Sequence, residues 1–354
     1  MTIDFLDQAA AALRGKRVLV RSDLDVPTEA GRVTDDHKIR DALPTLELLL
    51  QAGARVLVAS HRGRTRRPGP EDSLEAPGET LAELLGQEVR FIDECVGDGV
   101  KMLAGELQDG QLLLLENVCF RSEEERDDDT FARALATGVD AYVNDAPALL
   151  SRAHASIHAV TRHVPRRYAG QLVRFELDAA HALTGAPEGT AALLLGGDRL
   201  AGREGVLATL LARARVLVVG GGVGETFRHA AGMACDEAKV ETARVAAVQQ
   251  VLATARDRGV RVVFHGDDVE RTTLEDVRAL LWSGSLGTHD ARLALAVAEA
   301  TRRGTFSVLA GDDTVAELGR AHALGGFRHV SRAGTAFLDL VEGRDVPGLQ
   351  ALHR

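Results

Sequence analysis

Short apolar runs recur along the chain and alternate with segments whose apolar spacing is typical of helices. The runs are RVLV (17–20), ARVLVAS (54–60), QLLLLEN (111–117), DAYVND (140–145), AALLLGG (191–197), ARVLVVGGG (214–222), VRVVFHG (260–266) and TFSVLAGDD (305–313). Segments such as ALPTLELLLQAG (42–53) and FARALATG (131–138) have the spacing of helices packed on a sheet. This alternation predicts an α/β fold with parallel sheets.

The residues that come after these runs differ between the two halves of the chain. In the first half they are charged or polar, as in RSDLD (21–25), HRGR (61–64), EN (116–117) and ND (144–145). In the second half they are rich in glycine, as in GGDR (196–199), GGG (220–222) and GDDT (311–314). Ligands of open α/β sheets bind at the carboxyl ends of the strands, so the pattern predicts two binding regions. A solvated strand end with local ion pairs is the alternative for any one strand.

The change in composition predicts two lobes. The first spans residues 1–167, the second spans 186–339, and YAGQLVRFELDAAHAL (168–183) predicts an interdomain helix within a 168–185 hinge. The N-terminal segment predicts a short surface helix. The Pro- and Gly-rich stretch RGRTRRPGPEDSLEAPGE (62–79) predicts a surface loop.

Composition narrows the classes of partner. The 354-residue chain is 45% apolar and carries a formal net charge of −10, which argues against nucleic acid or an anionic membrane as a partner. Any anionic ligand must therefore meet a local basic cluster. Three widely spaced cysteines, without a basic and apolar leader, favour a reduced protein of the cytoplasm.

Each half suggests its own ligand. Basic side chains of the first half are suited to a phosphorylated or carboxylate substrate; they are Arg21, His61, Arg62, Arg64 and Arg152. Glycine turns of the second half suit phosphates, although neither the P-loop nor the dinucleotide fingerprint is present. A carboxylate at Asp312 or Asp313 is suited to Mg²⁺ on a nucleotide.

Two further groups have simpler interpretations. His154 and His158 are spaced as metal ligands on a helix, but a structural role is favoured because no third ligand lies nearby. The acidic runs at 123–125 and 127–129 are interpreted as a solvated face.

The ordered motifs resemble the phosphoglycerate kinase family along nearly the whole chain. They include KRVLVRSDLDVP, SHRGR, LLLLENVCF, YVNDA, RAHAS, LLGGDRL, VLVVGGGVGETF, WSGSLG, AGDDT and HVSRAGTAFLDLVEG. The resemblance implies a monomer with two doubly wound, Rossmann-like lobes around a cleft. It implies 3-phosphoglycerate on the first lobe, Mg²⁺ with ATP or ADP on the second, and phosphoryl transfer to the carboxylate by hinge closure, as in glycolysis. It also implies that the tail, residues 340–354, packs on the first lobe.

The resemblance also assigns roles to individual residues. On the substrate side it implies Arg21, Asp23, Asp25, His61, Arg64 and Arg152. On the nucleotide side it implies Gly197, Arg199, Arg203, Gly220, Gly221, Gly222, Asp290, Gly311, Asp313 and Thr314. Lys38, Arg199 and Arg21 would stabilise the transferring phosphoryl group, and Asp313 would hold the Mg²⁺ of the nucleotide.

Several positions depart from the family pattern. Asp25 replaces an asparagine, Lys38 and Cys119 replace arginines, and Arg199 and Arg203 replace lysines. The helix start at 332–336 and the turn at 282–285 also differ, and a stretch between Asp268 and Trp282 is shorter. Arg62 or Arg121 could supply the basic group lost at Cys119. Beside phosphoglycerate kinase activity, a kinase for another carboxylate, a catalytically silent nucleotide-binding protein and a dehydrogenase remain alternatives; the missing fingerprint counts against the last.

Overall fold

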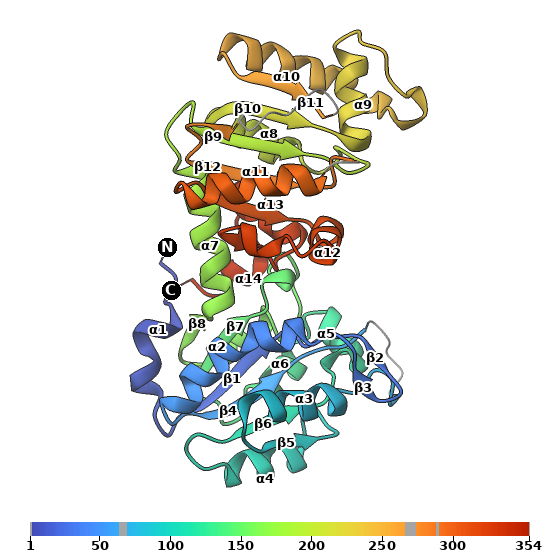
Figure 1. Cartoon of the computed structure of the whole chain (residues 1–354). Helices are drawn as coiled ribbons and strands as arrows, with labels where there is room; N and C mark the ends of the chain where they lie inside the picture. The colour runs from blue at the N-terminus through green and yellow to red at the C-terminus, as the bar shows by residue number, and fades with distance from the viewer. Residues whose placement is uncertain (1, 64–68, 266–273, 288–289, 354) are drawn as a thin grey trace. The chain divides into compact units, whose positions relative to one another are not determined.

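The computed structural model describes residues 2–63, 69–265, 274–287 and 290–353. It divides into two compact units, each built around its own sheet (Figure 1). One unit contains Met1–Phe175 together with Asp345–Arg354, and the other contains Glu176–Arg344. None of the described helices combines the length and apolarity needed to cross a bilayer.

The sheet of the first unit has six parallel strands in the order β5-β6-β4-β1-β7-β8. The strands are β1 (Arg17–Ser22), β4 (Arg55–Ala59), β5 (Val89–Ile92), β6 (Leu112–Leu115), β7 (Ala141–Asp145) and β8 (Arg167–Ala169), with a separate ribbon of β2 (Thr28–Glu29) and β3 (Arg32–Val33). The helices of this unit are α1 (Leu6–Ala9), α2 (His37–Gln51), α3 (Glu75–Leu85), α4 (Asp98–Glu106), α5 (Ser122–Glu125), α6 (Asp129–Leu135) and α14 (Pro347–Gln350).

The sheet of the second unit also has six parallel strands, in the order β11-β10-β9-β12-β13-β14. They are β9 (Ala191–Leu195), β10 (Ala214–Val219), β11 (Arg261–Phe264), β12 (Ala279–Ser283), β13 (Phe306–Ala310) and β14 (His329–Val330). The helices are α8 (Glu204–Leu211), α9 (Gly221–Ala230), α10 (Val245–Asp257), α11 (Asp290–Arg302), α12 (Asp312–Arg320) and α13 (Thr335–Val341). Helix α7 (Gln171–Thr184) begins in the first unit and continues into the second.

Burial on both faces explains why these runs form parallel strands. Val18, Leu19 and Val20 of β1 are all fully buried, as are the leucines of β6 to within 1%. Helices cover both faces of such a sheet, so the strands carry continuous apolar runs in place of alternation. The predicted fold class, two parallel α/β sheets, is confirmed.

Strand order fixes where ligands can bind. β1 has β4 on one side and β7 on the other, and β9 has β10 and β12 as its neighbours. At these central strands the chain stops adding strands on one side of the sheet and begins to add them on the other. The crevice outside the carboxyl ends of such strands is the usual position of a ligand. The charged motifs begin in the last residues of β1 and β7 and directly after β4, whereas the glycine turns come after β9, β10 and β13.

Parts of the predicted boundaries are wrong. The loop predicted at 62–79 ends early, because α3 begins at Glu75. Pro77 lies in the first turn of α3, where the N–H that proline lacks would have no partner within the helix. Gly78 lets α3 pack closely on β6, because a Cβ there would lie 2.9 Å from Leu114 Cδ2. The helix predicted at 168–183 begins only at Gln171, since Tyr168 and Ala169 belong to β8.

The chain enters α7 over two buried polar side chains. Gln171 N donates to Thr45 Oγ1 at 2.9 Å, and Leu172 N donates to Asp145 Oδ1 at 2.9 Å. These bonds satisfy two N–H groups of the first helical turn, which has no partners within the helix. A Cβ at position 170 would lie 2.2 Å from Asp145 Oδ1, so only glycine fits there.

The C-terminal residues lie on the first unit. Gly348 N donates to Leu150 O at 2.8 Å, and Arg167 Nη2 donates to His353 O at 2.8 Å. Ile3 and His353 form an antiparallel bridge. The two ends of the chain therefore meet beside β8.

Asp145 should make the stability of the protein fall as pH rises. Burial raises its pKa from 3.8 to about 8, so between about pH 4 and 8 the folded carboxyl keeps a proton that the unfolded one has lost. The free energy of unfolding should then lose ~1.4 kcal/mol per pH unit from this group. Asp145→Asn, which keeps the acceptor for Leu172, should remove that slope in denaturant titrations at several pH values.

The exposed Asp98 on α4 provides the matched control. Its carboxylate pairs with Lys101 at the surface, so Asp98→Asn should leave the slope unchanged. Equal slopes in the wild-type protein and Asp145→Asn would contradict the assignment of the slope to Asp145.

Candidate functional site

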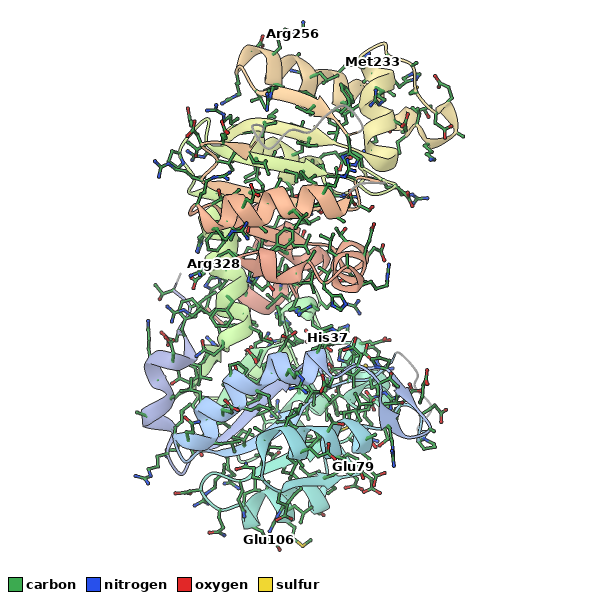
Figure 2. The ribbon with its side chains drawn as sticks, viewed as in Figure 1. His37, Glu79, Glu106, Met233, Arg256 and Arg328 are labelled. Carbon is green, nitrogen blue, oxygen red and sulfur yellow. The ribbon has the colours of Figure 1, made fainter. Side chains whose placement is uncertain are left out.

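The first candidate site lies at the carboxyl ends of β1 and β4. Arg21 is opposite Ala59 in the parallel register, which brings it near His61; Arg21 Nη2 lies 3.4 Å from His61 Nδ1. Lys38, in the first turn of α2, forms an ion pair with Asp23, with 3.0 Å between Nζ and Oδ2. Four of the predicted substrate or catalytic residues are therefore in one cluster. His37, the neighbour of Lys38, marks this end of α2 in Figure 2.

Arg21 is held by a buried network. The residue is only 1% exposed, its Nε donates to Ser156 Oγ at 2.7 Å, and its Nη1 donates to Ser22 O. Ser156 in turn donates through Oγ and N to the carboxylate of Glu124, at 2.5 and 2.9 Å. A charge this deeply buried is tolerable only when it is paired and hydrogen-bonded.

The prediction of a solvated acidic face is therefore wrong at Glu124, which is fully buried. It is also wrong at Asp127, whose carboxylate accepts from Ala159 N at 2.8 Å and pairs with His158 at 2.6 Å. His154 Nδ1 lies 3.8 Å from Glu124 Oε1. The two histidines thus face different carboxylates.

Burial and neighbouring charges set the ionisation of this cluster. Burial, with the positive charge of Arg21, lowers the pKa of His61 to about 4. His61 is therefore neutral near pH 7, and its Nδ1 can accept from Arg21, which leaves Nε2–H as a donor. Burial opposes ionisation of Asp23, but the charges beside it, including Lys38, hold the pKa of its carboxyl below the usual range.

One member of the predicted basic group, Arg62, is not in this cluster. Arg62 is 7% exposed and donates to Val26 O and Ser73 O at 3.3 and 3.1 Å, so its guanidinium holds the loop rather than a ligand. Arg64 lies outside the described residues. Asp25 has a clear local partner, since its Oδ1 accepts from Gly63 N at 3.0 Å.

The remaining substrate-side positions, Arg152 and Cys119, differ in exposure and charge. Arg152 is exposed, and its charge, with that of Arg21, acts with burial to lower the pKa of His154. Burial raises the pKa of the Cys119 thiol to about 11, so this position contributes no charge. Arg121 lines a separate pocket of about 850 Å³ with Phe91, Cys95 and other residues, so it does not replace the missing arginine in the Arg21 cluster.

The second candidate site consists of glycine turns packed backbone to backbone. A Cβ at Gly196 would lie 2.1 Å from Ser285 O, and one at Gly220 would lie 2.4 Å from Leu286 O. Gly221, at φ +58°, would place a Cβ 2.9 Å from Gly197 O. The ends of β9, β10 and β12 can approach this closely only without side chains. Gly221 also begins α9. Its N–H donates to Leu286 O at 2.9 Å and that of Val223 donates to Gly197 O at 3.1 Å, so these bonds hold the helix start against the neighbouring turns.

The two predicted nucleotide-side arginines differ in position. Arg203 Nη1 donates to Gly196 O at 2.7 Å, and its Nη2 donates to Arg199 O at 2.6 Å. Burial lowers the pKa of this guanidinium. Arg203 therefore braces the glycine turns, whereas the side chain of Arg199 is exposed.

Asp290 and Thr314 are buried next to this region. Asp290 Oδ2 accepts from Ser285 Oγ at 2.9 Å and from Leu286 N at 3.0 Å, and burial raises the pKa of its carboxyl. Thr314 is 1% exposed, and its Oγ1 has no hydrogen-bond partner among the described residues. A Cβ at Gly311 would lie 3.7 Å from this Oγ1.

The start of α12 has the donors that Mg²⁺ prefers. Asp312 and Asp313 are exposed in the first turn, and a Cβ at Gly334, before α13, would lie 3.6 Å from Asp312 Oδ2. Carboxylate oxygens that leave room for phosphate and water suit Mg²⁺, so these residues fit a magnesium nucleotide.

The altered helix start at 332–336 is anchored by Arg332 N, which donates to Glu176 Oε1 at 2.6 Å.

Comparison with known proteins gives a consistent result. The sequence pattern of the family described as "Phosphoglycerate kinase" matches residues 8–278. The cytosolic phosphoglycerate kinase of Triticum aestivum is 35% identical over 386 residues, covering 97% of this chain and 96% of the wheat protein. A phosphoglycerate kinase of Methylorubrum extorquens is 36% identical over 389 residues, covering 97% of each.

Solved structures show the same similarity. Phosphoglycerate kinase from Coxiella burnetii has a TM-score of 0.84 and 27% identity, with 96% of each chain covered. The enzyme from Pyrococcus horikoshii, at 24% identity, has a TM-score of 0.79 over 99% of this chain and 98% of its own, and supports the fold alone.

The alignment to the wheat protein is longer than this 354-residue chain, so the relative carries segments that this chain lacks. The shortening predicted between Asp268 and Trp282 falls partly on residues outside the described ranges. With identity above 30% over nearly the full length and the family pattern over most of it, the chain belongs to the phosphoglycerate kinase family.

Proposed function

We propose that this chain transfers a phosphoryl group between ATP and the carboxylate of 3-phosphoglycerate, with ADP and the acyl phosphate 1,3-bisphosphoglycerate as products. One observation carries the proposal: two hydrogen-bonded pairs, Arg21 with His61 and Lys38 with Asp23, lie at the strand ends of a family member, where the charges of Asp23 and Lys38 act on His61. The cations that such a transfer needs are thus retained.

On the acceptor side, the exposed Arg152 and the neutral His61, which donates through Nε2–H, hold the anionic substrate, and the buried Arg21 fixes His61 and adds its positive charge. A carboxylate oxygen then attacks the γ-phosphorus as the bond to ADP breaks, so no proton has to be removed. The transition state spreads negative charge over the phosphoryl oxygens, and positioning with electrostatic stabilisation supplies most of the rate. Lys38 supplies the cation, and its ion pair with Asp23 keeps it oriented.

On the nucleotide side, the turns at Gly197 and Gly220–Gly222 carry no side chains that would keep phosphates from the start of α9, where the helix dipole favours negative charge. Arg199, which is exposed beside them, is the cation proposed for the departing phosphate. The carboxylate of Asp313 would hold Mg²⁺, which neutralises phosphate charge when it is bound with the nucleotide. Gly311, Thr314 and Asp290 complete the proposed nucleotide site.

Direct transfer requires the two substrates to meet. We therefore include in the proposal a closing movement about residues 168–185. The proposal also includes a monomeric state. It includes a cytoplasmic location as well, because one matched relative is named as cytosolic.

The proposal is tested by measuring formation of 1,3-bisphosphoglycerate by the purified protein from Mg-ATP and 3-phosphoglycerate, through coupled reduction of the acyl phosphate; ADP formation is measured separately with other carboxylates. Turnover with 3-phosphoglycerate supports it. Turnover only with other carboxylates would assign a related kinase. Other carboxylates are worth testing because the neutral thiol at Cys119 leaves the substrate side with less positive charge. Nucleotide binding without any turnover would leave a silent family member.

Lys38 should affect turnover more than binding. Lys38→Met should lower kcat about 100-fold, because it removes a cation that acts on developing charge, whereas Lys38→Arg should retain activity. Steady-state kinetics with both substrates measure this. Lys101→Met, at an exposed ion pair on α4, is the control. A Lys38→Met protein with unchanged kcat would exclude this role.

Glu124 should act through Arg21 as a positioning residue. Glu124→Gln weakens the hold on Ser156, and a charge-assisted hydrogen bond is worth roughly 1.5–3 kcal/mol. We expect KM for 3-phosphoglycerate to rise about tenfold while KM for ATP stays constant. Glu123→Gln, one residue away on α5, should change neither value. Equal increases in both KM values would indicate general loss of structure.

The two neighbouring aspartates at the start of α12 can be distinguished. Asp313→Asn should raise the Mg²⁺ concentration needed for half-maximal rate and lower kcat, because a carboxylate ligand becomes a weaker amide. Asp312→Asn, in the same helical turn, should have the smaller effect. Magnesium titrations at fixed ATP measure both, and the reverse order would assign the metal to Asp312.

A further inference from the structure

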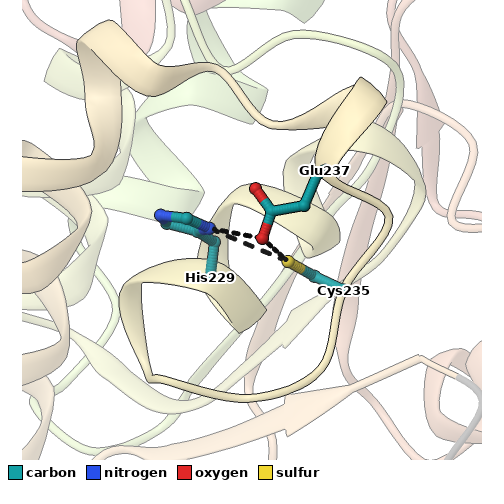
Figure 3. A group of neighbouring side chains, drawn as sticks. All are labelled: His229, Cys235 and Glu237. Atoms are coloured by element: carbon teal, nitrogen blue, oxygen red, sulfur yellow. Dashed lines mark hydrogen bonds and ion pairs between the residues drawn. The ribbon is translucent and has the colours of Figure 1, made fainter.

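Three side chains with metal-binding atoms converge that belong to neither candidate site. They are His229, Cys235 and Glu237, in the stretch HAAGMACDE at the end of α9 (Figure 3). Among the described residues they form the one group of three such side chains whose donor atoms lie within 4.8 Å of one another.

The backbone around them is fixed by other contacts. Gly232 N donates to His229 O at 3.0 Å, and Met233 N donates to Arg228 O at 2.9 Å, so the chain reverses at the end of α9. Gly232 has φ +72°, which favours glycine at this reversal. Asp236 N then donates to Glu225 Oε2 at 2.8 Å. The donors are thus brought together by the fold and do not depend on each other alone.

Their separations match three corners of a tetrahedron. Around Zn²⁺, with bonds of roughly 2.0–2.3 Å, the corners would be about 3.4 Å apart for N and O and about 3.6 Å apart where sulfur is involved. The structure has 3.2 Å between His229 Nδ1 and Glu237 Oε1, 3.4 Å between Cys235 Sγ and Glu237 Oε1, and 3.8 Å between Sγ and Nδ1. Each separation is within about 0.2 Å of the tetrahedral value.

The donor types select the class of metal. Nitrogen, sulfur and a single carboxylate oxygen suit Zn²⁺ or Co²⁺, whereas Mg²⁺ and Ca²⁺ require mostly oxygen. The side chains of His229 and Glu237 are 37% and 72% exposed, so an ion can reach them and water can fill the fourth position. Without metal, the same carboxylate accepts from the thiol; metal binding would release that thiol proton to solvent.

The segment that carries two of these donors is connected to the glycine-turn region. Glu241 N donates to Thr226 Oγ1 of α9 at 3.0 Å, and the Glu241 carboxylate accepts from Leu200 N. Arg244 pairs with Glu204 at 2.9 Å. Residues 232–244 therefore form a strap that runs from the end of α9 to the loop after β9.

We propose that His229, Cys235 and Glu237 bind one zinc-type divalent ion, which fixes the strap to α9. The site is separate from the magnesium of the nucleotide, because its ligands differ in type and its place is the opposite end of α9 from Gly221. Its occupancy does not depend on phosphoryl transfer.

The test is Co²⁺ titration of the chelator-treated full-length protein without nucleotide. One equivalent should give intense tetrahedral d–d bands together with a sulfur-to-cobalt charge-transfer band, and Zn²⁺ should displace it. Cys235→Ser should abolish the charge-transfer band, and His229→Gln should weaken Co²⁺ binding more than about tenfold. In hydrogen exchange, Zn²⁺ should increase protection of residues 232–244 in the wild-type protein alone.

Two controls keep the result specific. Cys119→Ser removes a buried thiol elsewhere, and His181→Gln removes an exposed imidazole on α7; both should bind Co²⁺ like the wild-type protein. Absence of a thiolate band, or a band unchanged in Cys235→Ser, would overturn the proposal, as would binding of Co²⁺ that His229→Gln does not weaken.

Discussion

Parallel pairing brings the carboxyl ends of neighbouring strands to one edge of each sheet, and both candidate sites depend on this. Arg21 is in register with Ala59 and with Asn144, so motifs some forty and more than a hundred residues apart in sequence become neighbours. In the second sheet, the same pairing aligns Leu195 with Val219 and Ser283. The chemistry then differs only in the residues at the end of each strand, which are charged in one unit and glycines in the other.

Burial of charge is the second constraint, because it fixes some side chains of the first candidate site independently of the replaced residues. Arg21 is fixed through Ser156 to the buried Glu124, so the geometry of its guanidinium does not depend on Arg152 or Cys119. Lys38 is held by Asp23 and keeps the positive charge of the arginine that the family has there. Asp25 retains the acceptor function that an asparagine would have toward Gly63.

The sequence predicted eight strands of the two sheets and the residues at their ends, because both can be inferred from apolar runs and their abrupt termination. It did not predict Glu124, since a carboxylate within an acidic run resembles a solvated one until Ser156, thirty-two residues later, covers it. The sequence also did not predict that the guanidinium of Arg203 donates to the glycine turns, because its partners there are backbone carbonyls. Four strands of the two sheets, β5, β8, β12 and β14, were not predicted. β8 and β14 are only three and two residues long, too short to give a recognisable apolar run.

The altered residues change the charge of the substrate side more than its architecture. Relative to the family pattern, the neutral thiol of Cys119 removes one positive charge and Asp25 adds one negative charge. Arg21, Lys38 and Arg152 remain, but Asp23 compensates part of their charge. Weaker attraction of an anionic substrate affects binding before it affects the stabilisation of a phosphoryl group in transfer. We therefore expect the chain to differ from its relatives mainly in affinity for the acceptor.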